Sequence, residues 1–208
     1  MPTIRLAALT ICFGFSTTLA APIQWPASQG GNNHYYEFIL QPEVRWTDAK
    51  VLAEAKVFNG NHGYLATITS PGETNFMASH WPERGGSDQN GWLGGWQDKS
   101  APFYSEPAGA WRWVTGEPFV YTNWFPGQPD NSGGQEYMRS NVNWQWDDFP
   151  DNPINPSVQY ISGYFVEYNV PEPGAMMLIA MMGAILGTRR RRCVTAGCPA
   201  RESETALI

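Results

Sequence analysis

The sequence predicts one α+β domain over residues 22–170, in which two helices flank short strands joined by long loops. Two segments carry helix signals, and short apolar runs with strand-like patterns lie before, between and after them. The rest of this region is rich in Gly, Pro and aromatic residues and poor in charge, a composition typical of a compact, loop-rich domain.

Residues 1–21 predict a secretory signal. Arg5 precedes an apolar run, residues 6–15, and small residues suited to cleavage follow at Ala20 and Ala21. We therefore expect the mature protein to be exported from the cytoplasm.

The first predicted elements of the domain are a strand and a helix. Residues 34–39 alternate well enough for a strand, and we expect His34 at its start to lie on the surface. A helix is predicted from Trp46 to a stop near Gly60, because apolar side chains recur at helical spacing. These apolar positions are Ala49, Leu52, Ala53 and Val57.

A second strand and a second helix follow. Residues 63–68 form an apolar run that predicts the strand. Residues 70–73, Ser-Pro-Gly-Glu, form a capping box in which Ser70 is the cap and Glu73 reaches back. We expect this helix to run to about Trp81.

The middle of the chain is rich in tryptophan. Residues 82–90 predict a polar loop, and residues 91–95, Gly-Trp-Leu-Gly-Gly, predict a core segment whose glycines permit close packing. Core packing is also favoured for Trp113 and Trp124. We expect at most one of three other tryptophans, Trp111, Trp144 and Trp146, to contact a ligand.

Five side chains with oxygen donors form the candidate metal site: Gln128, Asp130, Glu136, Asp147 and Asp148. Because none of them is a thiol or an imidazole, the set suits Ca²⁺, which takes six to eight oxygens, better than Zn²⁺. The residues alone leave another interpretation open, in which residues 128–130 are a proline turn and residues 147–148 belong to a solvated loop.

The order of these motifs resembles the C-type lectin-like domain. Five features stand in the family order across residues 34–168: the first helix with Trp46 and Ala49, the Trp92 motif, the Gln128-Pro129-Asp130 loop, Glu136, and the Trp146-Asp147-Asp148 strand. The resemblance implies a C-type lectin-like fold, in which two helices flank small antiparallel sheets, with a long calcium-binding loop region. It also implies that the closing strand, residues 163–168, pairs with the first strand.

In that family, the loop, the Glu and a Trp-Asn-Asp strand hold one calcium ion, and a sugar binds this ion directly. The resemblance therefore implies Ca²⁺ as the cofactor, with Asp147 in the place of the usual Asn. It implies a cis bond before Pro129, since a cis bond is cheap only before proline. The residues expected to contact the sugar are Gln128, Asp130, Glu136, Asp147 and Trp146.

Two further expectations concern specificity and a second ion. A Gln-Pro-Asp loop goes with galactose-type hydroxyl pairs in the family, although Asn131 and Ser132 stand where galactose binders often have a tryptophan. A second calcium site, known in some members, is not predicted, because Asn131 and Tyr137 stand where those members carry Asp.

We expect no disulfides in the domain. Most members of the family have two, but residues 21–173 contain no cysteine, and Cys193 and Cys198 lie beyond them. Alignment by motif puts Ala53 and Val166 at one of the family's pairs, and Met138 and about Asp151 at the other. The core and the calcium must then supply the few kcal/mol that a disulfide commonly contributes.

The carboxyl-terminal tail resembles a PEP-CTERM sorting signal of Gram-negative bacteria, in which an exosortase recognises Pro-Glu-Pro. Pro171-Glu172-Pro173 precedes an apolar run, residues 174–187, and four arginines, residues 189–192. The run of 14 residues is shorter than the ~20 that span a bilayer comfortably, and the arginines favour a cytoplasmic end. An ordinary short membrane anchor is the alternative.

The same resemblance implies a route for the protein. Residues 171–192 would hold it in the inner membrane in transit, and it would then reach the cell envelope or the extracellular space. Residues 193–208 would form a cytoplasmic extension, to which we assign no role.

The leading functional hypothesis is an exported, calcium-dependent lectin that binds a glycan or an extracellular polysaccharide. A protein-interaction or structural module that binds no sugar is the alternative. An enzyme is not predicted: acids bound to calcium are held ionised, so Glu136, Asp147 and Asp148 would not serve as the acid of a glycosidase. Nucleic acid is an improbable partner, since residues 22–173 carry 17 acids against 7 Lys and Arg.

Overall fold

The computed structural model describes residues 21–85, 90–151 and 161–170. Its strands are β1 (Ile23–Gln24), β2 (Tyr35–Leu40), β3 (Val57–Phe58), β4 (Asn61–His62), β5 (Tyr64–Leu65), β6 (Asn90–Gln97), β7 (Trp111–Trp113), β8 (Tyr137–Ser140), β9 (Trp146–Phe149) and β10 (Ile161–Tyr168). Its α-helices are α1 (Trp46–Ala55) and α2 (Pro71–His80), and three short 3-10 helices are η1 (Ala27–Gln29), η2 (Pro82–Gly85) and η3 (Val142–Trp144).

The predicted signal and tail lie outside this part of the chain. Residues 1–20 are not described, and neither is the sorting motif at residues 171–173, the apolar run 174–187 or the extension 193–208. Among the described residues, no helix is both long and apolar enough to cross a bilayer.

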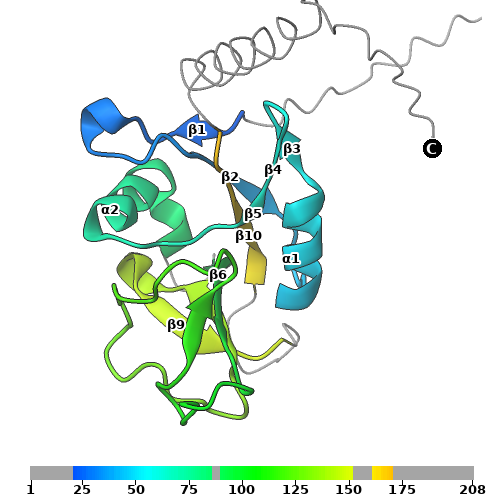
Figure 1. The fold of residues 1–208 in the computed structure, drawn as a ribbon, viewed down its shortest axis with the longest axis vertical. Helices are drawn as coiled ribbons and strands as arrows, with labels where there is room; N and C mark the ends of the chain where they lie inside the picture. Colours follow the sequence, from blue (N-terminus) through cyan, green and yellow to red (C-terminus); the bar gives the residue numbers. More distant parts are fainter. Residues whose placement is uncertain (1–20, 86–89, 152–160, 171–208) are drawn as a thin grey trace, which may run out of the picture.

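One mixed sheet forms the centre of the domain, with strand order β1-β2-β10-β6-β8-β9. β10 pairs antiparallel with β2, so that Tyr168 lies opposite Tyr35 and Gly163 opposite Leu40. This confirms the expected pairing of the first and last strands, and it places the two ends of the domain side by side (Figure 1). The β10–β6 pair is parallel, so the sheet is mixed, whereas small antiparallel sheets were expected.

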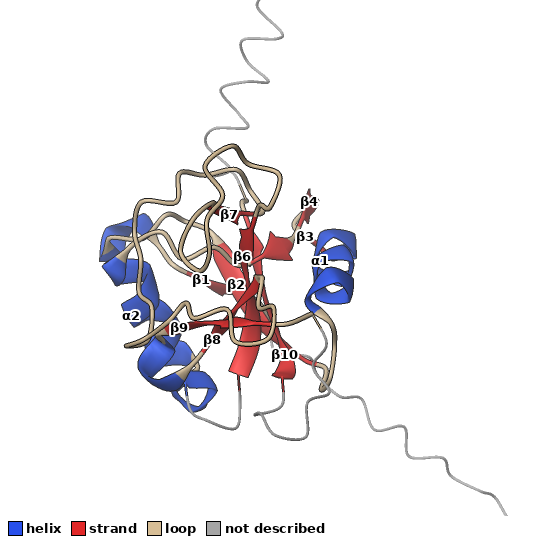
Figure 2. Cartoon of the chain, turned by 90° about the horizontal axis from the view of Figure 1, so that it is seen from below, coloured by secondary structure: helices blue, strands red, loops and turns tan. Residues whose placement is uncertain are grey.

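The two helices lie on opposite sides of this sheet, in agreement with the predicted α+β class (Figure 2). Trp46, Ala49 and Ala53 of α1 pack into one buried cluster with β10, and Phe76 and Met77 of α2 pack into another. Long loops join β6 to β7 and β7 to β8, and they gather at one end of the domain, as expected for the loop region.

Helix α1 ends earlier than predicted. It stops at Ala55, and Val57, which was expected on its apolar stripe, lies in β3 with 57% of its surface exposed. β3 pairs with β4 across Asn59 and Gly60, both of which have positive φ, at 48° and 81°. Asn-Gly with two positive φ angles is the preferred two-residue hairpin turn. Gly60 therefore closes a hairpin and does not end the helix.

Helix α2 has the predicted bounds and cap. Ser70 Oγ accepts a hydrogen bond from the Glu73 N–H at 3.2 Å, and Pro71 takes the first helical position. The Glu73 carboxylate reaches one residue further back than a capping box requires, since its Oε2 accepts from the Thr69 N–H at 2.7 Å. Its other oxygen, Oε1, faces the core and accepts from the Tyr36 hydroxyl.

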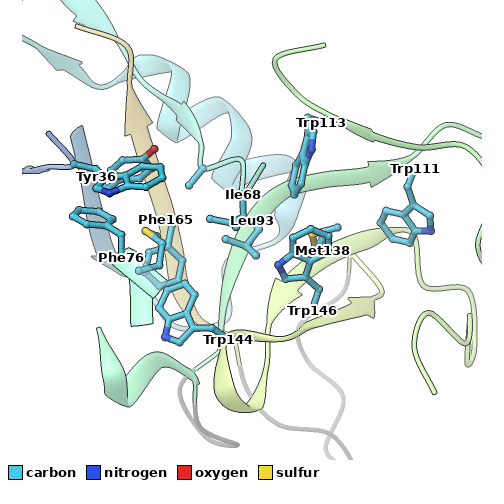
Figure 3. Packing of buried hydrophobic residues seen from close by; sticks show 13 residues of the cluster. Tyr36, Ile68, Phe76, Leu93, Trp111, Trp113, Met138, Trp144, Trp146 and Phe165 are labelled. Atoms are coloured by element: carbon cyan, nitrogen blue, oxygen red, sulfur yellow. The ribbon is translucent and has the colours of Figure 1, made fainter. Parts of the chain in front are cut away.

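The core contains the predicted tryptophans and glycines. Trp92 and Leu93 are fully buried, and a Cβ at Gly95 would lie 2.5 Å from the Met138 Cε. Trp146 stands over Met138, while Trp144 packs on Phe165 with ring centroids 4.9 Å apart (Figure 3). Close backbone approach at the glycines thus lets the sheet accept these large rings.

The positions that resemble the family's disulfides are mainly apolar and buried. Ala53 and Val166 are fully buried and belong to the same cluster, and Met138 is fully buried in the other. Asp151 instead accepts hydrogen bonds from the Thr47 N–H and hydroxyl at 3.0 and 2.9 Å. Packing and this polar contact therefore occupy the places of the cross-links.

His34 is not the surface histidine that we predicted. Its Nδ1 lies 2.6 Å from Glu167 Oε1, and only 18% of its side chain is exposed. Tyr36, two residues on, is fully buried and donates to Glu73. His34 therefore belongs to a buried polar cluster beneath α2.

Candidate functional site

The candidate site lies where the loop before β8 runs beside β9. Trp124 and Trp146 form an isolated parallel bridge, and the Phe125 N–H donates to the Trp146 carbonyl at 2.8 Å. The Gln128–Pro129 bond is cis, as expected. Backbone pairing thus brings residues 128–130 next to Asp147 and Asp148, which are 17 or more positions away in the sequence.

Asp148 fastens this loop to the strand. Its carboxylate is fully buried and accepts from the Asp130 N–H at 3.1 Å and from the Asn131 N–H at 2.8 Å. Burial raises the pKa of Asp148, and these backbone hydrogen bonds oppose the rise. Each carboxylate oxygen still has a second lone pair, so the group can hold the loop and accept a further ligand.

One carboxylate oxygen of Asp147 forms a buried ion pair with Arg139. Its Oδ2 accepts from Arg139 Nε at 3.0 Å and Nη2 at 2.5 Å, and the guanidinium carbon lies 3.9 Å from the ring centroid of Phe149. Burial raises the pKa of Asp147, the charge of Arg139 opposes this, and the charge of Asp130 adds to it. The carboxylates of Asp130 and Asp147 therefore lie close enough for their negative charges to repel each other.

Two oxygens of the predicted set are buried and receive no hydrogen bond from any described residue: Gln128 Oε1 and Asp147 Oδ1. The described chain has only one other such side-chain atom, Gln97 Oε1. A buried acceptor without a partner costs roughly 1–3 kcal/mol, so native structures seldom keep one unless something else satisfies it. These oxygens fit a bound cation.

Glu136 does not join the other four residues. It lies just before β8 and forms an ion pair with Lys99, whose side chain is 50% exposed. Its backbone carbonyl accepts from the Gln97 N–H at 2.9 Å. The structure therefore places the Asp130 backbone against Asp148, next to Asp147 in β9, and leaves Glu136 with a different partner.

The donor set fits calcium only in part. In the described part of the chain, no three or more His, Cys, Asp or Glu side chains are grouped so as to hold a metal ion. Gln128 Oε1 and Asp147 Oδ1 are the two unsatisfied oxygens of the predicted set, and oxygen donors of this kind suit Ca²⁺. Glu136 can become a fifth donor only after its ion pair with Lys99 opens.

The expectation that Trp146 contacts a sugar is corrected by its burial. Trp146 is 1% exposed, and Trp113, Tyr121 and Trp124 pack edge-on against it with centroids 5.4–5.7 Å away. A ring enclosed in this way has no free face for a ligand. Trp111 and Trp144, the other two candidates, are 5% and 3% exposed, so they too serve the core.

Sequence reasoning missed Arg139 and Lys99, the two cations at this site. Arg139 lies directly opposite Asp147 in the β8–β9 register, and opposite charges at such positions attract each other. The hairpin between them contains η3 with positive φ at Asn143 and Trp144. Asn readily adopts a positive φ but Trp does not, so the sequence did not reveal this turn or the register that it sets.

The fold and this loop define a lectin-like domain, and comparison with known proteins identifies the family. Residues 45–158 match the lectin C-type domain family, so the chain belongs to that family. Residues 169–192 match the PEP-CTERM protein-sorting motif. Both assignments agree with the resemblances found in the sequence.

Among individual proteins, lithostathine of Rattus norvegicus is 25% identical over 142 residues, which cover 68% of this chain and 79% of the rat protein. The cow CD23 C-type carbohydrate-recognition domain, solved in the presence of a GlcNAc2Man3 oligosaccharide, has a TM-score of 0.51 at 21% identity and covers 68% of this chain and 92% of its own. Human lithostathine has a TM-score of 0.50 at 21% identity, with 67% and 95% covered. These structural likenesses support the fold alone.

Proposed function

We propose that this protein is an exported lectin that binds carbohydrate through a calcium ion held by Gln128, Asp130, Asp147 and Asp148. The observation that carries this proposal is the pair of buried, unsatisfied oxygens at Gln128 and Asp147. They stand at the positions where the resemblance to C-type lectins implies metal ligands. A cation at this place would satisfy both oxygens.

The residues of the site would perform three tasks. Asp148 holds the loop against β9 through the Asp130 and Asn131 N–H groups. The Gln128 amide donates to a sugar hydroxyl, and the carboxylates accept from hydroxyls, in charge-assisted hydrogen bonds. Calcium, when bound, supplies the positive charge to which two neighbouring hydroxyls coordinate. The amide at residue 128 and the acid at residue 130 stand in the order that favours sugars with galactose-type pairs of hydroxyl groups.

In this proposal, the carboxyl-terminal tail determines where the exported protein is delivered. Residues 1–21 direct export, and Pro171-Glu172-Pro173 is read by an exosortase-type enzyme while residues 174–187 hold the chain in the inner membrane. The lectin domain then reaches the cell envelope or the extracellular polymer. A glycan of that polymer is the expected partner. A catalytic role is not part of the proposal.

A second candidate function has its own support. Arg139 and Lys99 form ion pairs with Asp147 and Glu136. Such internal cations suit a domain that keeps its fold without calcium and binds a protein partner instead of a sugar. The two candidates differ in whether calcium changes stability and sugar binding.

The test compares melting temperatures of the full chain in Ca²⁺ and in EGTA, followed by a glycan array under both conditions. A ligand that binds only the folded state stabilises it, by about 2.7 kcal/mol at 100 times its Kd. We expect a calcium-dependent rise and calcium-dependent glycan signal. Gln128→Ala should lose both, because it removes an oxygen that makes no hydrogen bond within the described protein.

Matched variants separate the two candidates. Gln29→Ala, an exposed glutamine in η1, is the control and should behave like the parent protein. Lys99→Met should strengthen the calcium response, because it frees Glu136. If calcium shifts neither melting nor glycan binding in any of these proteins, the lectin proposal fails and the interaction module replaces it.

A further inference from the structure

A hollow of about 250 Å³ lies in the loop region, apart from the calcium-type site. Its walls include Phe103, Trp111, Arg112, Glu117, Pro118 and Phe119. The volume is below the ~300–1,000 Å³ of pockets for drug-sized ligands, so it suits one small ring. None of the five residues predicted as metal ligands lines it.

The floor of this hollow is rigid and aromatic. Trp111 is 5% exposed, and its indole N–H donates to the Pro107 carbonyl at 3.1 Å. It packs edge-on against Trp124 with centroids 4.8 Å apart, and Phe119 packs on Trp113 at 5.1 Å. These rings are held by the core (Figure 3 shows Trp111 at its margin), so the floor is in place before any ligand arrives.

The rim carries one exposed aromatic ring. Phe103 is 63% exposed, which is unusual for so large an apolar side chain. The guanidinium carbon of Arg112 lies 5.6 Å from its ring centroid, and Asp98 Oδ2 holds the Arg112 Nε at 2.8 Å. The ring thus lines the hollow beside the Arg112 guanidinium, which Asp98 holds in place.

A fixed carboxylate completes the rim. Glu117 Oε2 accepts from the Thr115 hydroxyl at 2.7 Å and from the Thr67 hydroxyl at 3.0 Å. Its Oε1 accepts no hydrogen bond from the described residues, so it remains available to a ligand. The turn before it includes Gly116 at a φ of 78°, which only glycine adopts readily.

Charge restricts what the hollow can bind. Arg112, Asp98 and Glu117 together give the rim both donors and acceptors, with one positive charge and two negative ones. An anionic ligand would be repelled by Glu117, whereas Arg112 can donate to a neutral ligand and Glu117 can accept from it. A neutral ring with hydroxyl groups satisfies both, and its apolar C–H face can lie on aromatic rings.

We propose that this hollow is a second, metal-independent binding site for one neutral pyranose residue. Phe103 supplies the stacking face, and Arg112 and Glu117 hydrogen-bond to the hydroxyls. This site stands apart from the proposed calcium site, so either can exist without the other.

The test is saturation-transfer NMR of the full chain with methyl hexopyranosides of galactose, glucose and mannose, in excess EGTA. We expect saturable binding of at least one of them. Phe103→Ala should weaken this binding by at least tenfold, and Glu117→Gln by several-fold. Since Phe103 is exposed, its removal should leave the fold intact.

Controls make each outcome decisive. Val120→Ala, 83% exposed and outside the hollow, should bind like the parent protein. Methyl glucuronide, which is anionic, should bind more weakly than the neutral sugars. The proposal is overturned if no neutral hexoside binds in EGTA, if Phe103→Ala binds within twofold of the parent, or if the glucuronide binds best.

Discussion

At the scale of single residues, two buried carboxyl groups share one hydroxyl. Tyr36 Oη lies 2.6 Å from Glu73 Oε1 and 3.1 Å from Glu167 Oε1, and Asn32 Nδ2 donates to it at 2.8 Å. Because a tyrosine has one proton to donate, it cannot serve both carboxylates when both are ionised. Burial and the charge of Glu167 raise the pKa of Glu73 to about 7, although hydrogen bonds from Tyr36 and Thr69 oppose the rise.

This raised pKa predicts that the protein loses stability as the pH rises toward 8. The folded state holds the Glu73 proton more tightly than the unfolded chain, in which the carboxyl titrates near 4.5. The stabilisation is complete below about pH 4.5 and is lost as the pH rises through about 7, at most about 3 kcal/mol. Glu73→Gln stays neutral and should flatten this loss between pH 5 and 8 in urea unfolding.

Glu54→Gln is the matched control, since Glu54 is an exposed acid on α1, and it should keep the slope of the parent protein. His34 acts in the same direction: burial lowers its pKa, but the hydrogen bond and charge of Glu167 outweigh this and leave the pKa raised. Equal pH slopes for the parent protein and Glu73→Gln would rule out Glu73 as the source.

The buried pair of Arg139 and Asp147 predicts a second effect at this scale. Arg139→Met should lower the free energy of unfolding by about 3–5 kcal/mol, because it leaves an unpaired buried carboxylate. The double variant with Asp147→Asn should recover most of this loss, as measured by urea unfolding in EGTA. A double variant no more stable than the single one would mean that Arg139 acts through packing on Phe149, not through charge.

The sequence contained most of the candidate site, but not its internal partners. Gln128, Asp130 and Asp148 could be proposed from their order and chemistry, and the structure joins the Asp130 N–H to the Asp148 carboxylate. The ion pair of Glu136 with Lys99 could not be predicted, because the two residues are 37 positions apart and only the fold joins them. Trp146 was misassigned because a tryptophan in a short strand looks the same in sequence whether it is buried or exposed.

At the scale of elements, helix α1 begins without a side-chain cap from Arg45, the residue that precedes it. One of its first N–H groups is bonded from across the fold, since Asp151 accepts from the Thr47 N–H at 3.0 Å. An acidic side chain at a helix start also interacts favourably with the helix dipole. Asp151 thus replaces the local cap that α2 has in Ser70.

Loss of this contact should cost about as much as the loss of a cap. We expect Asp151→Ala to lower the free energy of unfolding by about 1 kcal/mol, measured in urea at pH 7. Asp151→Asn keeps an oxygen acceptor and should lose less than half of that. If the two variants are equally destabilised, the contribution of Asp151 comes from its charge and not from its hydrogen bonds.

Both helices could be predicted from sequence because their signals are local. The strand after α1 was not predicted, because apolar residues continue at helical spacing to Val57. Asn59 and Gly60 are nevertheless typical of a hairpin turn. The contact of Asp151 with Thr47 could not be foreseen, because 104 residues separate them. Local patterns thus predict elements well and their long-range caps poorly.

At the scale of the whole molecule, the family resemblance predicted the architecture that composition alone could not. The α+β class and the pairing of the first and last strands are confirmed. The parallel pairing of β10 with β6 was not expected, because a strand pattern does not say which neighbours it takes. Buried apolar residues at Ala53, Val166 and Met138 show how the fold is kept without cysteines.

The place of β10 also constrains the timing of export. It is the last strand in sequence, yet it lies between β2 and β6, so the sheet cannot close until the chain is available up to Tyr168. Pro171 follows three residues later, and three extended residues reach at most about 10 Å. In the proposed processing, an enzyme that reads residues 171–173 would therefore act close to Tyr168, or before β10 has docked. Folding and the proposed processing would then depend on the same short piece of chain.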